Sequence, residues 1–182
     1  SSEKRFYKKI TDIYALAVDY EPKADETQLF FKTVQNKLLF AATRNTAAEL
    51  IANRSDVSKD NMGLTSWKSA KVRKADVTVS KNYLKQEELD ILNRVVSMYL
   101  DFAELQAQQK RQMFMKDWQE KLDAFLSFNG QEILNNPGKV QKKVADQLAE
   151  QCYDQFNKVR IQLDDQKEND FDKAIKELKK KK

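Results

Sequence analysis

The chain has 182 residues, 41% of them hydrophobic and 34% charged, with no histidine and a single cysteine, Cys152. Histidine is the usual general base near neutral pH and the most common metal ligand, so these counts exclude Ser-His and Cys-His nucleophile pairs and every His-ligated metal site. Gly63, Gly130 and Gly138 are too far apart for a phosphate-binding loop. The composition predicts a protein that is not an enzyme, with no cofactor, no metal and no small-molecule substrate.

The first part of the chain contains three amphipathic segments. Apolar residues at helical spacing predict a helix over about residues 3–19 and a second over about 29–41. Thr46 and Glu49 have the spacing of a capping box, in which each side chain binds a free N–H at the start of a helix. This box predicts a third helix that continues to about Arg54.

Helical periodicity fades from Ser55 to Asn82. Ser, Asp, Asn and Gly accumulate there, and Val77 and Val79 alternate with polar residues. The pattern predicts an irregular segment with a short extended piece.

Helical periodicity returns in the second half of the chain. The strongest stripe predicts a helix over about residues 86–109, a shorter stripe covers 115–126, and a third predicts a helix over about 140–162. The remaining tail, residues 163–182, has only a weak stripe and is expected to be a marginal docked helix or a frayed end.

These elements predict an all-α fold. We expect a domain of about six helices with an irregular basic middle segment over residues 1–162, and a charged tail over residues 163–182. The apolar stripes on residues 86–109 and 140–162 are broader than a small bundle needs, which favours a homodimer.

Compartment and processing are also suggested by the sequence. No apolar run approaches the roughly 18 residues that a membrane span needs, and no secretory signal is visible. A lone cysteine argues against an extracellular disulfide framework. We therefore expect a cytoplasmic protein with no membrane partner. The chain starts at Ser1 without an initiator Met, so we also expect a segment upstream.

The net charge of +5 is concentrated in one stretch. Residues 61–85 hold six Lys or Arg and one Asp, a net +5, so the rest of the chain sums to zero. Cations beside hydroxyls and aromatic rings can contact phosphates and stack on bases, which makes DNA a candidate partner. The alternative is a solvated loop in which Trp67 and Tyr83 anchor the core. The candidate polyanion-contacting residues are Lys68, Lys71, Arg73, Lys74, Lys81 and Lys85.

Other reactive groups have simpler interpretations. Acidic side chains gather in two groups. Because the predicted helices are highly charged, we expect each group to form a solvent-exposed helix face rather than a pair of catalytic acids. Neither group has the spacing of a calcium-binding loop. Cys152 lies on an apolar stripe and is expected to be a buried structural thiol. The two acidic groups are Glu87, Glu88 and Asp90, and Asp117, Glu120 and Asp123.

A series of ordered segments closely resembles the bacterial RhuM virulence protein family. The similarity runs from about residue 3 to 160. The segments that carry it are Glu3–Tyr14, Phe31–Leu38, Thr46–Glu49, Asn61–Trp67, Lys81–Leu84, Leu92–Glu104 and Met115–Trp118.

The resemblance implies a DNA-associated role. Members usually carry an upstream segment similar to a small DNA-binding module, and they occur in pathogenicity islands and beside type I restriction-modification systems. Some relatives are named with Fic/Doc proteins, whose HxFx[D/E]GNGR motif is absent here, so the resemblance implies no catalytic residues. We expect the C-terminal domain of a DNA-associated protein; the alternative is an oligomerisation or partner-binding module without nucleic-acid contact.

Overall fold

The computed structural model describes residues 8, 11–12, 14–21, 23, 25–109 and 112–181. Within them the chain forms only helices, turns and loops, with no strand, which confirms the all-α prediction. The described residues contain five α-helices, so the expectation of about six is not confirmed. They are α2 (Asp25–Thr43), α3 (Ala47–Arg54), α4 (Gln86–Gln108), α5 (Met115–Phe128) and α6 (Lys142–Lys180). The short 3-10 helices are η1 (Asp60–Gly63), η2 (Lys74–Asp76) and η3 (Ser80–Tyr83).

Two expectations about individual elements change. Of the predicted helix over residues 3–19, residues 3–7, 9, 10 and 13 lie outside the described residues. Residues 8, 11, 12 and 14 are helical, and 15–19 form turns and a bend. The expected extended piece does not form a strand: Val77 adopts helical dihedrals after η2, and Val79 is extended immediately before η3 begins at Ser80. The capping box at Thr46 is present as predicted.

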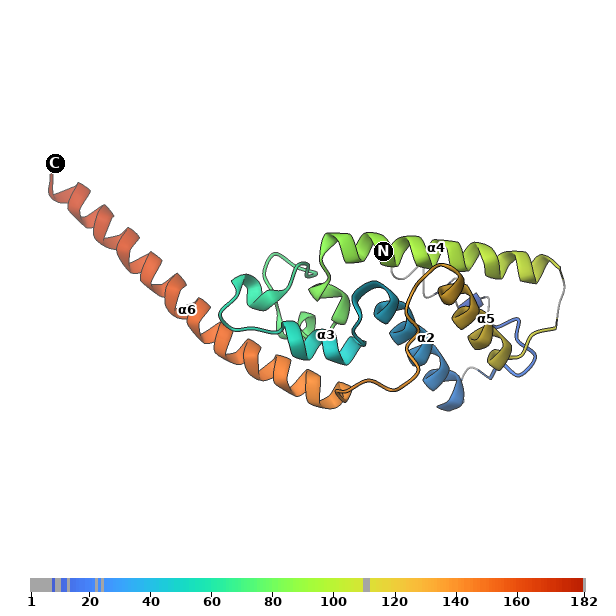
Figure 1. Ribbon diagram of the computed structural model, residues 1–182. Coiled ribbons are helices and arrows are strands. Elements are labelled where there is room, and N and C mark those ends of the chain that lie inside the picture. The colour runs from blue at the N-terminus through green and yellow to red at the C-terminus, as the bar shows by residue number, and fades with distance from the viewer. Residues whose placement is uncertain are drawn as a thin grey trace.

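The C-terminal region forms one long helix. α6 has 39 residues and therefore a length of about 58 Å. No Pro or Gly interrupts it after Gly138, and Lys, Glu, Gln and Ala favour helix throughout. Figure 1 shows its first half against α3 and its second half extending away from the other helices. The tail is thus helical but not docked.

A first hydrophobic core joins α2, α4, α5 and the segment around Tyr14. Trp118 and Leu122 of α5 are almost completely buried in it. The Tyr14 and Tyr99 hydroxyls share a hydrogen bond of 2.7 Å, which satisfies both groups inside the core. Apolar burial therefore fixes α4 beside α2, as Figure 1 shows.

A second core joins α3, the middle segment and the first half of α6. Ala145 and Ala149 of α6 have no exposed surface, and such small side chains allow two helices to approach closely. Ile51 of α3 and Met62 of η1 are also fully buried there. The middle segment is therefore packed between helices even though it has no long helix of its own.

One charged side chain is buried between α2 and α5. Lys37 is 5% exposed, and its Nζ donates to Asp123 Oδ1 and to the Leu134 carbonyl oxygen, each at 2.8 Å. Removing the partner of a buried charge is costly because the charge remains without compensation.

We expect Asp123→Ala to lower the free energy of unfolding by about 3 kcal/mol, because it leaves the Lys37 ammonium with one carbonyl partner. Glu120→Ala on the same helix is the control. Its exposed pair with Lys116, at 3.9 Å, should contribute less than about 1 kcal/mol. Urea denaturation measures both variants, and equal losses would contradict the assignment.

A second stability prediction concerns Gly63. Its φ is +86°, and a Cβ there would lie 2.2 Å from the Arg54 carbonyl oxygen. Gly63→Ala should lower the free energy of unfolding by about 3 kcal/mol or more, because the added Cβ would clash with the backbone. Gly130 has φ +69°, and a Cβ there would have no neighbour within 4 Å, so Gly130→Ala should cost only about 1 kcal/mol. Thermal and urea denaturation of the pair would reveal the difference; similar costs would contradict the close approach.

Candidate polyanion-binding surface

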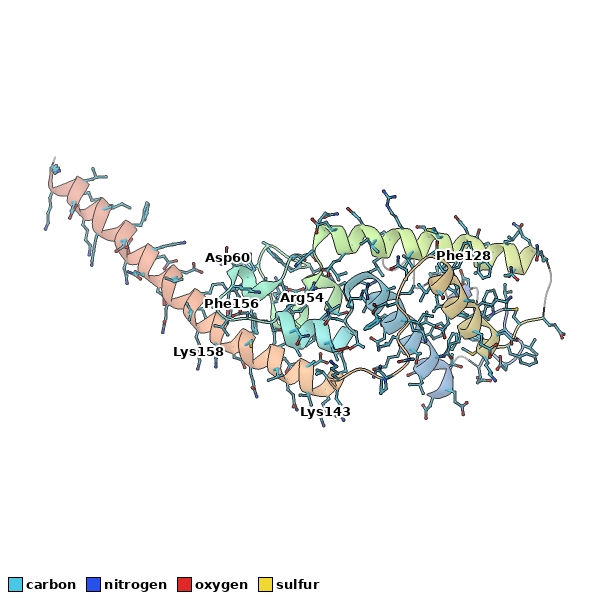
Figure 2. All side chains as sticks on the ribbon, in the orientation of Figure 1. Arg54, Asp60, Phe128, Lys143, Phe156 and Lys158 are labelled. Carbon is cyan, nitrogen blue, oxygen red and sulfur yellow. The ribbon has the colours of Figure 1, made fainter. Side chains whose placement is uncertain are left out.

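The middle segment is held by Arg54, the last residue of α3. Its guanidinium donates two parallel hydrogen bonds to Glu88 of α4, at 2.5 and 2.8 Å, and a third to the Tyr83 carbonyl oxygen at 2.9 Å. Both side chains are largely buried, at 21% and 15% exposure. Paired, two-point contacts of this kind set orientation as well as adding energy. Figure 2 labels Arg54 beside the middle segment.

Tyr83 anchors the segment from within. It is 1% exposed, its hydroxyl donates to the Val77 carbonyl oxygen at 2.6 Å, and it accepts a hydrogen bond from Ser55 at 3.0 Å. Burial raises the pKa of Tyr83 to about 12. The core-anchor interpretation of Tyr83 therefore holds, because a buried ring cannot stack on a base.

Trp67 is half-buried. It packs against the second core, and its indole N–H donates to the Ala70 carbonyl oxygen at 3.4 Å. The tryptophan therefore supports the loop that presents the neighbouring lysines.

The six predicted cations fall into three groups. Lys71 and Lys74 pair with acidic side chains of α6, Lys71 with Asp164 at 3.6 Å and Lys74 with Asp154 at 3.2 Å. Lys81 is half-buried. The exposed cations that form no ion pair with a described residue are Lys68, Arg73 and Lys85.

The Lys71–Asp164 and Lys74–Asp154 ion pairs join the middle segment to α6 at the protein surface. All four of their side chains are at least half exposed, from 50% to 70%. Such surface pairs contribute little to stability, so a phosphate can replace either carboxylate at small cost. Positive charge on the segment is thus partly neutralised in the free chain and accessible to a competing anion.

A hollow of about 470 Å³ lies between α2, the start of α3 and the loop that leads into α6. Lys32, Lys139 and Lys142 contribute to its lining. Lys142 Nζ also donates to the Thr78 carbonyl oxygen at 3.0 Å and to Asp146 at 2.5 Å, which joins the hollow to the middle segment. The sequence did not predict these lysines as a group, because Lys32 is more than 100 residues away from Lys139 and Lys142.

The hollow has one helix end with free donors. Thr46 and Glu49 already bind N–H groups at the start of α3, at 3.3 and 3.0 Å. α6 starts after Gln141, which makes no side-chain cap. The first N–H groups of α6 and the nearby ammonium groups are therefore the donors that an anion would meet there.

The acidic groups are more structural than predicted. Asp123 binds Lys37 and Glu88 binds Arg54, so neither belongs to a purely solvated face. Asp117 accepts the Phe114 N–H at 2.9 Å, at the start of α5. These carboxylates stabilise the fold.

Cys152 is half-buried against the second core. Burial, with a smaller contribution from Asp56, raises the pKa of its thiol. A raised pKa reduces the thiolate fraction, as expected for a structural thiol.

Two searches of the described residues bear on other functions. No three His, Cys, Asp or Glu side chains lie together as a metal site in this part of the chain. None of its helices is long and apolar enough to cross a membrane.

The fold and the surface thus define an all-α domain whose basic segment is held in place by an arginine–glutamate pair. The model of the Virulence protein RhuM family matches residues 1–164, so the chain belongs to this family and the resemblance is confirmed. Comparison with curated proteins and with solved structures gave no match.

The Arg54–Glu88 pair should make stability depend on pH. The hydrogen bonds from Arg54 lower the pKa of Glu88 below its usual 4.5. The stability that ionised Glu88 contributes through this pair is therefore fully present above the pKa of Glu88 in the unfolded chain. It is lost as pH falls through the lower pKa of Glu88 in the folded chain.

We expect Glu88→Gln to lower the free energy of unfolding by about 2 kcal/mol at pH 7. Between about pH 5 and about pH 3 the stability of this variant should decline less than that of wild type. Denaturant titrations at several pH values measure this, with Glu87→Gln as the exposed neighbouring control. Parallel pH profiles for wild type and Glu88→Gln would contradict it.

Proposed function

We propose that this chain is a non-enzymatic helical domain of a DNA-associated protein, and that its middle segment contacts the DNA backbone. The observation that supports the proposal is the concentration of the chain's whole net charge, +5, in residues 61–85. Exposure of Lys68, Arg73 and Lys85 makes cations available on that segment. The family's association with mobile and restriction-linked loci agrees with this role.

The contact is electrostatic. Each phosphate that a cation neutralises releases condensed counterions, so binding should weaken steeply as salt rises and should show little sequence preference. Tyr83 is buried, which removes one of the two candidate stacking residues and favours backbone contact over base contact. With so few cations, the dissociation constant should be no lower than about 10⁻⁶ M.

The cations of the hollow extend this surface. Lys142 touches the Thr78 carbonyl, so the first turn of α6 is continuous with the middle segment. A backbone phosphate close to that turn would meet Lys139 and the free N–H groups of α6.

A partner-binding module is the second candidate function. Ile91, Met98 and Leu105 of α4 lie seven residues apart and are 41%, 46% and 50% exposed. This apolar stripe is on the solvent side of a helix whose other face fills the first core. Such an exposed apolar stripe would suit a protein partner, and in this interpretation the basic segment has no binding role.

The test compares two double variants with the same change in charge. Lys68→Glu with Arg73→Glu should reduce binding to duplex DNA at low salt by at least about tenfold. Lys116→Glu with Lys158→Glu alters exposed lysines of α5 and α6 that lie outside the middle segment and the hollow, and it should have a smaller effect; Figure 2 labels Lys158. Lys71 and Lys74 are left unchanged because they contact α6.

Fluorescence anisotropy with a labelled duplex measures these affinities, and circular dichroism checks that both variants remain helical. Absence of binding by the wild type, or equal losses in the two variants, would contradict the proposal. Undiminished binding of a protein partner by the Lys68–Arg73 double variant would favour the second candidate.

A further inference from the structure

The second half of α6 has no partner within the described chain. Lys71–Asp164 is the last ion pair between α6 and the rest of the protein. From residue 165 to 181 no side chain forms an ion pair or hydrogen bond with another described residue. Figure 1 shows this part of the helix extending away from the body. The region matched by the family model also ends at residue 164.

The charges of this projecting half are divided along its length. Residues 165–172 hold four acidic side chains and one Lys, a net −3, and residues 173–181 hold five Lys and one Glu, a net +4. Lysines in the last turn complement the helix dipole, but the dipole does not explain acidic residues in the middle of a long helix. The division instead makes the segment complementary to a reversed copy of itself.

An apolar stripe runs across the point where the charge changes sign. Phe171, Ala174, Ile175 and Leu178 are separated by three or four residues, so they share one face of the helix. Phe171 and Leu178 are 66% and 68% exposed. Large apolar side chains at this spacing form the seam along which two helices pack.

We propose that residues 165–181 pair with the same segment of a second copy of the chain, in antiparallel orientation. The acidic half of each helix then lies beside the lysine-rich half of the other, and Phe171, Ile175 and Leu178 from both copies form a short core between them. A two-fold axis near residues 172–175 relates the copies, so every contact occurs twice.

Charge selects both the orientation and the partner. A parallel pair in register would place acids beside acids and lysines beside lysines, which is destabilising. The exposed stripe on α4 is a less suitable self-contact, because α4 carries five acidic side chains and one arginine, and two copies would repel. The inference therefore assigns self-association to the end of α6, beyond residues 86–109 and 140–162, from which the homodimer was predicted.

The pairing is independent of the proposed DNA contact, since it uses none of the cations of the middle segment. It would place the two bodies at opposite ends of a helix pair about 25 Å long. Two basic segments on one assembly could then bind one duplex together, which raises the effective concentration for the second contact.

Sedimentation velocity of the chain from about 10 µM to about 500 µM, without DNA, is the first measurement. We expect a reversible monomer–dimer equilibrium that weakens as salt increases, because the flanking contacts are attractive. Phe171→Glu with Leu178→Glu should weaken dimerisation at least about tenfold. The matched control, Phe128→Glu with Leu29→Glu, changes side chains that are 90% and 64% exposed elsewhere and should leave it unchanged.

A charge-exchange experiment tests the complementarity directly. One variant replaces the acids Asp165, Glu168, Asp170 and Asp172 with Lys; the other replaces Lys173, Lys176, Lys179 and Lys180 with Glu. Each variant alone should be monomeric, and an equal mixture should form heterodimers. Circular dichroism confirms that α6 remains helical in each.

A monomer at every concentration would overturn the inference, as would dimers that persist in the Phe171–Leu178 variant or an equal mixture that stays monomeric. A dimer that tightens with added salt would indicate parallel pairing and overturn the antiparallel assignment. A wild-type chain that binds DNA but does not self-associate would refute only this inference. A chain that self-associates but does not bind DNA would refute only the proposed function.

Discussion

The interaction on which the architecture depends is the contact of Arg54 with Glu88 and the Tyr83 carbonyl. Arg54 ends α3, and Glu88 lies in the first turn of α4, so the contact joins the helices on either side of the middle segment. It also crosses the boundary between the cores, since Tyr83 is buried in the second and Leu84 in the first. A guanidinium that binds one carboxylate at two points and a carbonyl at a third leaves these elements little freedom to rotate.

Once the middle segment is fixed, it provides, together with α3, the surface against which α6 packs. Alanines at the contact let the two backbones approach, and further along α6 the acidic side chains of Asp154 and Asp164 reach the lysines of the segment. Fold and proposed function therefore share the same charges. The carboxylates of α6 that pair with the segment, Asp154 and Asp164, are the groups with which a phosphate would compete.

α6 has two physically different halves. The first half buries small side chains in the second core, while the second half exposes Phe171 and Leu178 and divides its charges into an acidic and a basic part. In a solvated helix only the lysines of the last turn are favourable, through the helix dipole, whereas in an antiparallel pair each acidic half would lie beside a basic half. The same helix thus serves as a structural element of one chain and as a candidate contact between two.

The sequence by itself determined the features that depend on neighbours along the chain: the helical periods, the capping box at Thr46, the excess charge in residues 61–85 and the family. It could not determine contacts between distant residues, because periodicity reports which face is apolar and not what covers that face. The buried Lys37–Asp123 pair, the role of Glu88 and the anchoring of Tyr83 all join residues at least 28 positions apart. Tertiary structure alone decided that Lys71 and Lys74 face carboxylates while Lys68 and Arg73 face solvent, because packing of α6 brings its acids to some lysines and leaves others uncovered.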